Sequence, residues 1–477
     1  MTTLVATEGL LNPSIENAFA VSLKNGFSNL IHSIEIQASN NAVVSTMSQT
    51  GAMINFKLLT EMSQDDVANL APSLHFAKDN ALGISYNGES SAGGVGECNN
   101  KIQPTLFDPA LGYGKSGFGG TNDGRLARME NTSYDSEGKS IGALNQSGKD
   151  YCTRSADGKV VNYYAIVNVP LTMLSDWFKK TPMLRGVYYR ITLNLNTNCV
   201  SNMTVAGGKF TSVSTSSQTG TVPYMISPIG EGIDIGTCTG LELSIGIAKN
   251  SINKTGNTYS HPTLQSCRLY ASMLDMTPQA EQMYLQKSPT KLIQYNDFLS
   301  FQSLAIPAGG NLNQILTNSI AKARRLIGIP VLSGTVNYAG AGSVISPLAS
   351  PFSSAPCTTA SNPITNFNVL LSGSNLYQSN LNYSFEQFTN ELRKTGAING
   401  GLSLGLSSGL LNQNDFENGY RFIVADLSRT SSEATDNISR SIQVILTNSG
   451  DKPIDVLWFL EYERSVEIDV STGSLIA

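Results

Sequence analysis

Apolar and polar residues alternate without interruption between Gly186 and Asn196. The apolar positions of this stretch are Val187, Tyr189, Ile191, Leu193 and Leu195. Successive side chains of a strand point to opposite faces, so a period of two predicts an antiparallel strand with one buried face and one face in water. We therefore expect a half-buried strand over these residues.

A short amphipathic helix is predicted just before this strand. Leu171, Leu174 and Phe178 are spaced i, i+3 and i+7, which places them on one face of a helix. Pro170 suits a helix start and Pro182 a helix end, because proline lacks the N–H that a helix interior needs. The segment therefore predicts a helix followed by a strand.

The same order of helix and strand recurs between residues 382 and 429. Ser384 and Gln387 have the spacing of a capping box, and Gly396 suits the end of a helix. The apolar face of this second helix consists of Phe385, Phe388 and Leu392. A second strand is predicted after a glycine-rich interval, from the alternating residues Tyr420, Phe422 and Val424.

Each helix and strand pair is followed further along by a strand rich in apolar residues. These closing strands are expected at Arg268–Leu274 and Ile454–Tyr462. The recurrence predicts two similar β-sandwich domains in tandem, residues 1–285 and 286–477. Residues 276–290 are expected to form a short helical linker between them.

Shorter patterns predict further elements. Strands are expected near residues 28–37, 53–59, 240–247, 291–306 and 315–332, and a helix from Ser63 to Leu70 with acidic residues in its first turn. Ser441–Thr447 and Ile454–Val470 are expected to form a hairpin. Residues 1–24 are expected to be an arm that docks elsewhere.

Long polar intervals separate these elements. Residues 83–160, 197–222 and 333–363 are rich in Gly, Ser, Thr, Asn and Pro. Loops of this length are uncommon in a compact core and usually have a function at the surface. We expect the last two intervals to form an outward crown.

Composition supports a β-rich fold and argues against a nucleic-acid-binding arm. Only 14% of the 477 residues are charged, the net charge is -5, and neither end carries a basic block. The tightest basic group is Lys322, Arg324 and Arg325, which we expect on a solvated face. Direct packaging of DNA by a basic arm is therefore not expected.

The cysteine and histidine pattern predicts no metal site. The six cysteines are scattered without a CxxC pair: Cys98, Cys152, Cys199, Cys238, Cys267 and Cys357. The histidines, His32, His75 and His261, are also far apart in sequence. Residues 1–11 have neither the basic region nor the apolar core of a signal peptide, so we expect synthesis in the cytosol with mainly reduced thiols.

Several short motifs match catalytic patterns without their structural context. Ser140, Ser403 and Ser407 each lie in a G-x-S-x-G sequence, but none follows an apolar strand and precedes a helix as a nucleophile elbow requires. Gly112–Ser116 resembles part of a phosphate loop, but Pro109 stands where its first glycine belongs. Asp65–Asp66 and Glu461/Glu463 are better explained by a helix start and a solvent-facing strand. We assign no catalytic, cofactor-binding or metal-binding residue, and expect no enzyme.

Taken together, these segments resemble the double jelly-roll major capsid proteins of virophages, polinton-like viruses and adintoviruses and, more distantly, adenovirus hexon. The segments that carry the resemblance are Val169–Asn196 with Trp177–Phe178 and Tyr188–Arg190, Asn382–Phe388, Gly419–Phe422 and Asp426–Arg429. The resemblance implies an all-β fold of two tandem eight-stranded jelly rolls, with short helices between strands and long loops.

The resemblance also implies a function. Such a chain is expected to be the structural major capsid protein of a DNA virus, forming homotrimeric, pseudo-hexameric capsomers that tile an icosahedral capsid. Its expected partners are copies of itself, neighbouring capsomers, and penton and minor capsid proteins, without sequence-specific nucleic-acid binding. Its expected place is the virion, after synthesis in the host cytoplasm.

Two other classes of protein remain as alternatives. Jelly rolls also serve in receptor- or carbohydrate-binding surface proteins, although two matched domains without an aromatic-lined site argue against this. A hydrolase on a β-scaffold is disfavoured because no acid, base and nucleophile set stands out.

Overall fold

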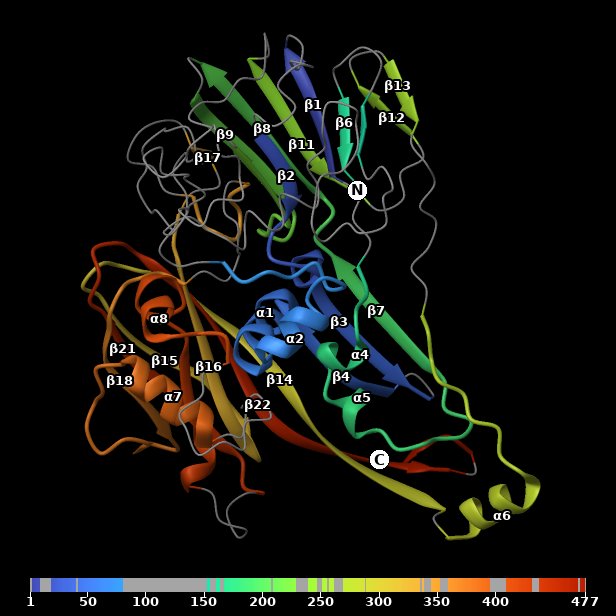
Figure 1. Cartoon of the computed structure of the whole chain (residues 1–477). Coiled ribbons are helices and arrows are strands. Elements are labelled where there is room, and N and C mark those ends of the chain that lie inside the picture. The colour runs from blue at the N-terminus through green and yellow to red at the C-terminus, as the bar shows by residue number, and fades with distance from the viewer. Residues whose placement is uncertain are drawn as a thin grey trace.

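The computed structural model describes most of the chain outside its longest polar interval (Figure 1). The described residues are 2–8, 19–39, 42–79, 152–154, 160–163, 167–206, 209–228, 239–246, 251–254, 257–260, 269–287, 289–334, 337–338, 345–351, 359–394, 409–430, 437–470 and 472–476. Within them the chain is mainly antiparallel β-structure, as the sequence predicted.

Strands from residues 290–469 form a sandwich of two antiparallel sheets. One sheet has the order β14 (Thr290–Ile306), β22 (Ile454–Asp469), β16 (Ala323–Leu332) and β20 (Ile423–Asp426). The other has the order β15 (Asn311–Ile320), β21 (Arg440–Asn448), β18 (Ile364–Leu371) and β19 (Ser374–Asn375). The short strand β23 (Leu475–Ile476) is added beside β22.

This strand order is that of a jelly roll. Counted along the chain from β14 and leaving out β17 and β23, the first sheet holds the first, eighth, third and sixth strands, and the second holds the second, seventh, fourth and fifth. Consecutive strands at the start and end of the series therefore alternate between sheets, as in two interlocked Greek keys. Residues 290–469 thus have the jelly-roll topology that the resemblance implied.

One sequence-predicted feature of this sandwich is wrong. Residues 441–447 and 454–470 do not pair as a hairpin, because β21 and β22 belong to different sheets. The turn between them carries the chain from one sheet to the other. A local turn signal predicts a change of direction, but it does not say which sheet receives the next strand.

A close packing contact in the sandwich explains one glycine. A Cβ atom on Gly328 would lie 2.5 Å from the ring of Trp458, on the neighbouring strand. The Trp458 indole is fully buried and donates a 2.9 Å hydrogen bond to the Ser303 hydroxyl. Any side chain at residue 328 would therefore have to displace this ring.

The second predicted helix is present as α7 (Phe385–Lys394), between the fifth and sixth strands of the roll. Phe388 and Leu392 are fully buried, and Gln387 N–H is capped by the Ser384 hydroxyl at 3.4 Å. Gly396, the predicted end of this helix, lies outside the described residues. The predicted helix face is therefore confirmed.

The glycine-rich interval before β20 also contains a helix that the sequence did not predict, α8 (Gln413–Gly419). It begins with a capping box of Asn412 and Asp415, and Phe416 of this helix stacks on Phe388 at 5.2 Å. β20 is shorter than expected and buried at every position, because helices cover the face that would otherwise meet water. The alternating pattern at residues 420–424 predicted a strand with one face in water, but both faces of β20 are buried.

The first part of the chain forms a smaller sheet beside β14. Its order is β4 (Ala42–Ser48), β3 (Ile31–Ala38) and β7 (Tyr189–Leu195). The predicted strand at residues 186–196 is thus confirmed as β7. The strand near residues 28–37 is confirmed as β3, which follows a single turn of 3-10 helix, η1 (Phe27–Leu30).

Further strands lie above this sheet (Figure 1). In the described residues, six strands of the first part form one sheet with β17 (Asn337–Tyr338) of the second part added beside β9. The order is β17, β9 (Lys209–Ser217), β8 (Cys199–Ala206), β11 (Gly240–Ile245), β1 (Thr2–Glu8), β6 (Val160–Tyr163) and β5 (Cys152–Arg154). Two strand pairs accompany it, β10 (Tyr224–Pro228) with β2 (Phe19–Leu23) and β12 (Ser251–Lys254) with β13 (Asn257–Ser260).

These sheets correct two expectations. Residues 1–24 are not an arm that docks elsewhere, because β1 pairs with β11 and β6 and β2 pairs with β10. The interval 197–222 is not a loop, because β8 and β9 form a hairpin there, and its place in an outward crown stays a prediction. Thr is enriched in strands, and buried and more exposed positions alternate along these two strands.

The interval 333–363 also differs from a crown loop where it is described. Ile345, Ala349 and Ser350 are buried. The carbonyls of Leu348 and Pro351 accept 2.7 Å hydrogen bonds from the backbone N–H groups of Val222 and Ile226. This segment therefore packs on the first part of the chain.

The expected strand at residues 53–59 is instead a helix, α1 (Thr50–Glu61). Met53, Ile54 and Phe56 are fully buried, and Phe56 meets Phe422 edge-on at 5.1 Å. A short apolar run that is buried on every side has no periodicity that separates a strand from a helix. The next helix, α2 (Gln64–Asn69), is confirmed with a capping box between Ser63 and Asp66.

The first predicted amphipathic helix is divided into two single turns. α4 (Leu171–Leu174) and α5 (Trp177–Lys180) are separated by Ser175, which is extended, and Asp176. The break turns Trp177 into the core, where its ring meets Tyr295 of β14 edge-on at 5.0 Å. The predicted spacing identified the covered face but not the break.

The predicted linker helix is confirmed as α6 (Pro278–Lys287), but the strand expected before it is absent. In the described residues 269–277 no strand forms. Leu269, Tyr270, Met273 and Leu274 are 65%, 81%, 88% and 73% exposed. An apolar segment usually signals a core strand, and this one instead lies on the surface.

We predict that Phe388→Ala lowers the free energy of unfolding by about 3–5 kcal/mol, because it removes a fully buried ring. Urea unfolding followed by circular dichroism measures this loss. Gln387→Ala, on the same helix but partly exposed, should change it by less than about 1 kcal/mol. Equal effects of the two substitutions would contradict the packing described for α7.

Candidate assembly surface

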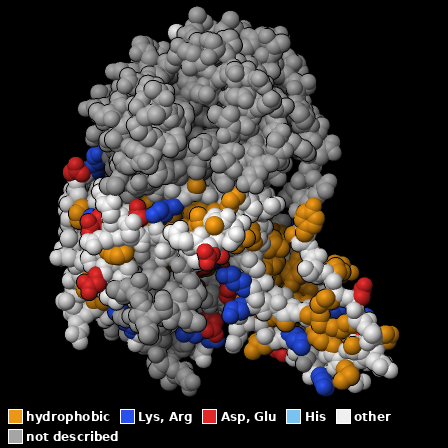
Figure 2. Space-filling view, in the orientation of Figure 1, with side chains coloured by type: hydrophobic (Ala, Val, Ile, Leu, Met, Phe, Trp, Pro, Cys, Tyr) orange, Lys and Arg blue, Asp and Glu red, His pale blue; other side chains and the backbone are white. Residues whose placement is uncertain are grey.

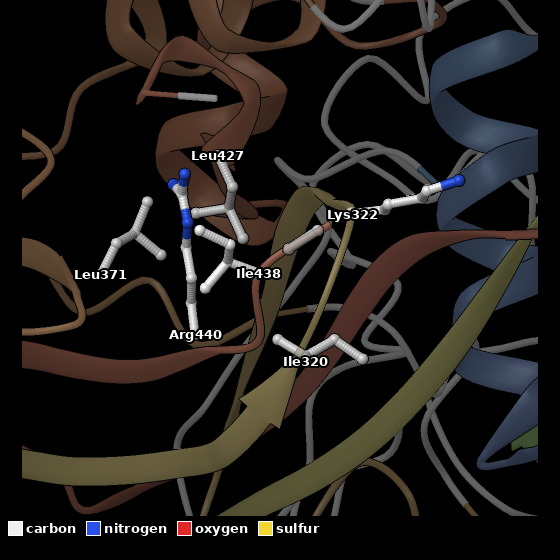
Figure 3. Close-up of a pocket in the computed structure, with 7 residues that line it drawn as sticks. Ile320, Lys322, Leu371, Leu427, Ile438 and Arg440 are labelled. Atoms are coloured by element: carbon white, nitrogen blue, oxygen red, sulfur yellow. The ribbon is translucent and has the colours of Figure 1, made fainter. Parts of the chain in front are cut away.

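Two small pockets lie among the described residues. The pocket in Figure 3 has a volume of about 10 Å³, room for roughly one water molecule. The side chains of Leu427, Ile438 and Arg440 meet around it, whereas Lys322 extends away. A second pocket, beside Asn29 and Asn196, is equally small.

The described residues also hold no cluster of three or more potential metal ligands. Of the cysteines, Cys199 is buried, and burial raises the pKa of its thiol to about 12. His32 is partly buried, which lowers its pKa, and His75 is buried. None of these three groups is placed as a nucleophile or a ligand.

The serine and glycine motifs lie outside the described residues. This applies to Ser140, Ser403 and Ser407, and to Gly112–Ser116. In the part of the chain that is described, no helix is long and apolar enough to cross a membrane.

We predicted that the basic group Lys322, Arg324 and Arg325 lies on a solvated face, and this is wrong for Arg325, whereas Lys322 and Arg324 are partly exposed. Arg325 is buried and its Nε donates a 2.7 Å hydrogen bond to Glu461, which is also buried. Arg324 contacts Glu463 at 2.6 Å, and this guanidinium lowers the pKa of the Glu463 carboxyl. Glu461 and Glu463 of β22 therefore pair with arginines of the neighbouring strand β16. We predicted that both carboxylates face solvent, and this is wrong for Glu461.

A second group of buried charges joins the small sheet to the sandwich. Asp297 of β14 accepts hydrogen bonds from the Ser45 hydroxyl at 2.8 Å and from Arg464 of β22 at 3.4 Å. The same guanidinium donates to the carbonyls of Val43 and Val44 at 2.8 and 3.1 Å. Burial raises the pKa of Asp297 despite these partners. The hydrogen bonds of Asp297 and Arg464 therefore hold β4 against β14 and β22.

Large apolar side chains gather on one surface, which we call the linker surface. It consists of residues 183–189, residues 269–292 and Ile476, and it lies at the lower right of Figure 2. Its most exposed apolar members are Tyr188, Leu269, Tyr270, Met273, Leu274, Met283 and Leu292. Monomeric proteins rarely expose large side chains of this kind together, so such a patch indicates a contact with another protein.

Polar contacts hold the linker surface in place. The Tyr284 hydroxyl donates to the Met183 carbonyl, and Arg185 forms a 2.6 Å ion pair with Glu281. The ammonium group of Lys291 lies 4.8 Å from the centre of the Tyr284 ring. α6 is thereby attached to the segment that leads into β7, and the exposed side chains are carried by an ordered support.

Sequence reasoning identified the residues of this surface but not their role. The run at residues 268–274 was apolar enough to predict a closing strand. A one-dimensional pattern does not distinguish an apolar segment that is buried in its own chain from one that faces a partner. The same holds for Tyr188 and Tyr189, which the sequence placed on opposite faces of a strand but which are both exposed.

Comparison with known proteins gives matches in structure only. No protein-family model matches the chain, and no curated protein matches it in sequence. A structure of the Sputnik virophage matches with 11% identity and a TM-score of 0.42, covering 100% of this chain and 80% of that chain. The capsid of the virus PBCV-1 matches with 8% identity, a TM-score of 0.37, and coverage of 100% and 88%.

A third match is the Faustovirus major capsid protein, with 9% identity, a TM-score of 0.36, and coverage of 94% of this chain and 73% of that chain. All three matches are structures of viruses or of viral capsid proteins. The fold assignment itself rests on the strand order of this chain.

We predict that Asp297→Asn changes how stability depends on pH. The raised pKa means that the folded state favours the protonated carboxyl more than the unfolded state does. The wild type should therefore lose stability relative to the variant as pH rises from the unfolded value of 3.8 through the raised folded value. Urea unfolding of both proteins at several pH values from about 4 to 7 measures this difference.

Asp66→Asn provides a control of opposite sign. The Ser63 backbone N–H and hydroxyl lower the pKa of Asp66, so its contribution to stability is present above the unfolded value of 3.8 and is lost as pH falls through the lowered one. The same trend for both variants would show that the burial of Asp297 is not the cause.

Proposed function

We propose that the protein is a structural major capsid protein, which forms trimeric, pseudo-hexagonal capsomers that tile an icosahedral virus shell. The observation that carries this proposal is the jelly-roll order of β14 to β22, with α7 between the fifth and sixth strands. Jelly rolls build viral shells because two sheets packed face to face make a rigid block with protected edges.

The proposed division of the chain into two domains follows the repeat of helix and strand in the sequence. Residues 1–285 and 286–477 are proposed as two roll-based domains, so that three chains present six similar units around one axis. The linker surface lies where residues 269–292 connect them, and it supplies apolar area for contacts between chains. The virion is the proposed place of the protein, and neighbouring capsomers, penton proteins and minor capsid proteins are its proposed partners.

The proposal includes no enzymatic activity and no sequence-specific binding of nucleic acid. In the described residues, the small pockets and the internal pairing of Lys322, Arg324 and Arg325 with glutamates support this view. A net charge of -5 provides little counterion release on a DNA duplex.

We predict that the purified protein is a homotrimer of three 50.9-kDa chains, about 153 kDa. Mass photometry or light scattering gives the mass, and negative-stain images should show hexagonal outlines. A stable monomer at micromolar concentration under all salt conditions would contradict the proposed function.

We further predict that Ser140→Ala, Ser403→Ala and Ser407→Ala leave the trimer intact, because none of these serines has the strand–turn–helix context of a nucleophile. Incubation with a serine-directed fluorophosphonate should label the protein only at background level. Stoichiometric labelling that disappears in one of the three variants would show a nucleophilic serine and would overturn the assignment as a purely structural protein.

A further inference from the structure

The linker surface is large enough for a permanent protein interface. Seven of its side chains, Tyr188, Leu269, Tyr270, Met273, Leu274, Met283 and Leu292, are each 54–88% exposed. At roughly 150–200 Å² for each large side chain, they alone present on the order of 800 Å² of apolar surface. This equals the area that each partner of a standard stable complex buries, and it exceeds the largest apolar patch of a typical monomer.

Part of this surface also offers an unpaired backbone. Residues 269–276 are exposed and form neither helix nor turn, and no described strand pairs with them. An extended segment with apolar side chains can add to the edge of a sheet, where the backbone groups supply hydrogen bonds and the side chains supply specificity. A partner with a free sheet edge and a small apolar patch would therefore suit it.

This chain itself carries such an edge. β15 is the outermost strand of its sheet and pairs, in the described residues, with β21 alone. Ile315 of β15 is 53% exposed and Leu304, at the end of β14, is 67% exposed. The two lie in neighbouring segments, because Gln314 contacts both Ser303 and the Gln302 carbonyl. We call this the β15 edge.

The linker surface and the β15 edge lie far apart on one molecule. The 17 residues of β14 join them, with Leu292 near one end and Leu304 near the other (Figure 1). At about 3.3 Å per residue, this strand spans roughly 50 Å. The same chain therefore cannot cover its own linker surface with its own β15 edge.

We propose that the linker surface of one chain binds the β15 edge of a second copy, with residues 269–276 aligned along β15. The proposal rests on the proposed function, because it names the contact that holds the capsomer together. Two different patches that bind each other make a head-to-tail contact, and such contacts close into a ring when the rotation between copies allows it. A trimer then has three equivalent contacts and no free linker surface.

Charge substitutions on each side test the proposal. Met273→Arg places a cation in the linker surface, and Ile315→Arg places one on the β15 edge. Each should raise the concentration for half-assembly of the trimer by roughly 30-fold or more, because each charge would be buried at the contact. Leu70→Arg is the control, since Leu70 is 45% exposed, lies at the end of α2 and belongs to neither patch. It should leave the trimer unchanged.

A mixture of the two variants separates this contact from others. Met273→Arg chains keep an intact β15 edge, and Ile315→Arg chains keep an intact linker surface. An equimolar mixture should therefore form dimers of two 50.9-kDa chains, although each variant alone is a monomer. Mass photometry measures both results, and unchanged circular dichroism and unfolding midpoints show that the variants fold.

Each other outcome counts against the proposal. A wild-type monomer would overturn the proposed function together with this contact. A trimeric wild type that tolerates Met273→Arg would show that the linker surface binds something other than a second copy in the trimer. Dissociation by Met273→Arg but not by Ile315→Arg would show that the β15 edge is not the partner surface, and the absence of dimers in the mixture would have the same meaning.

Discussion

The pairing of β14 with β22 is the interaction on which the rest of the structure depends. Its register runs from Thr290 opposite Asp469 to Ile306 opposite Ile454, along almost the full length of both strands. At one end, this ladder supplies the first and last strands of the jelly roll. At the other end, it continues beyond the sandwich and carries β4 and α5 on its side. A shift of this pairing by one residue would move the core-facing side chains of one strand to the opposite face of the sheet.

Buried polar groups make this arrangement specific. On the paired strands, Asp297 lies opposite Tyr462, and Arg464 lies two residues further along β22. Asp297 binds the Ser45 hydroxyl, and Arg464 binds the carbonyls of Val43 and Val44. Removing the Asp297 side chain would leave the buried Ser45 hydroxyl without its acceptor, and an unsatisfied buried polar group costs about 1–3 kcal/mol. Apolar contacts alone, such as that of Trp177 with Tyr295, would permit the small sheet to slide along the ladder.

The exposed side of the molecule follows from the same ladder. Because β14 is much longer than the sandwich needs, its first residues extend away from the roll and carry the linker surface with them. α6 is attached to the segment before β7 through Arg185, Glu281 and Tyr284, and Lys291 of the extension lies over the Tyr284 ring. Leu292 on this extension is 63% exposed, so a second chain can reach it.

The sequence by itself determined the class of the fold, the helix face of Phe388 and Leu392, the linker helix, and the strands β3, β7, β14 and β22. These features depend on local periodicity and end signals, which neighbouring residues specify. It did not determine that residues 53–59 form a helix, since a segment buried on all sides shows no period. Only the tertiary structure decided that β21 and β22 enter different sheets, that Glu461 is buried with Arg325, and that residues 269–274 face outward. Each of these three features depends on which distant part of the chain packs against the segment. The local pattern of residues in that segment does not specify its distant neighbour.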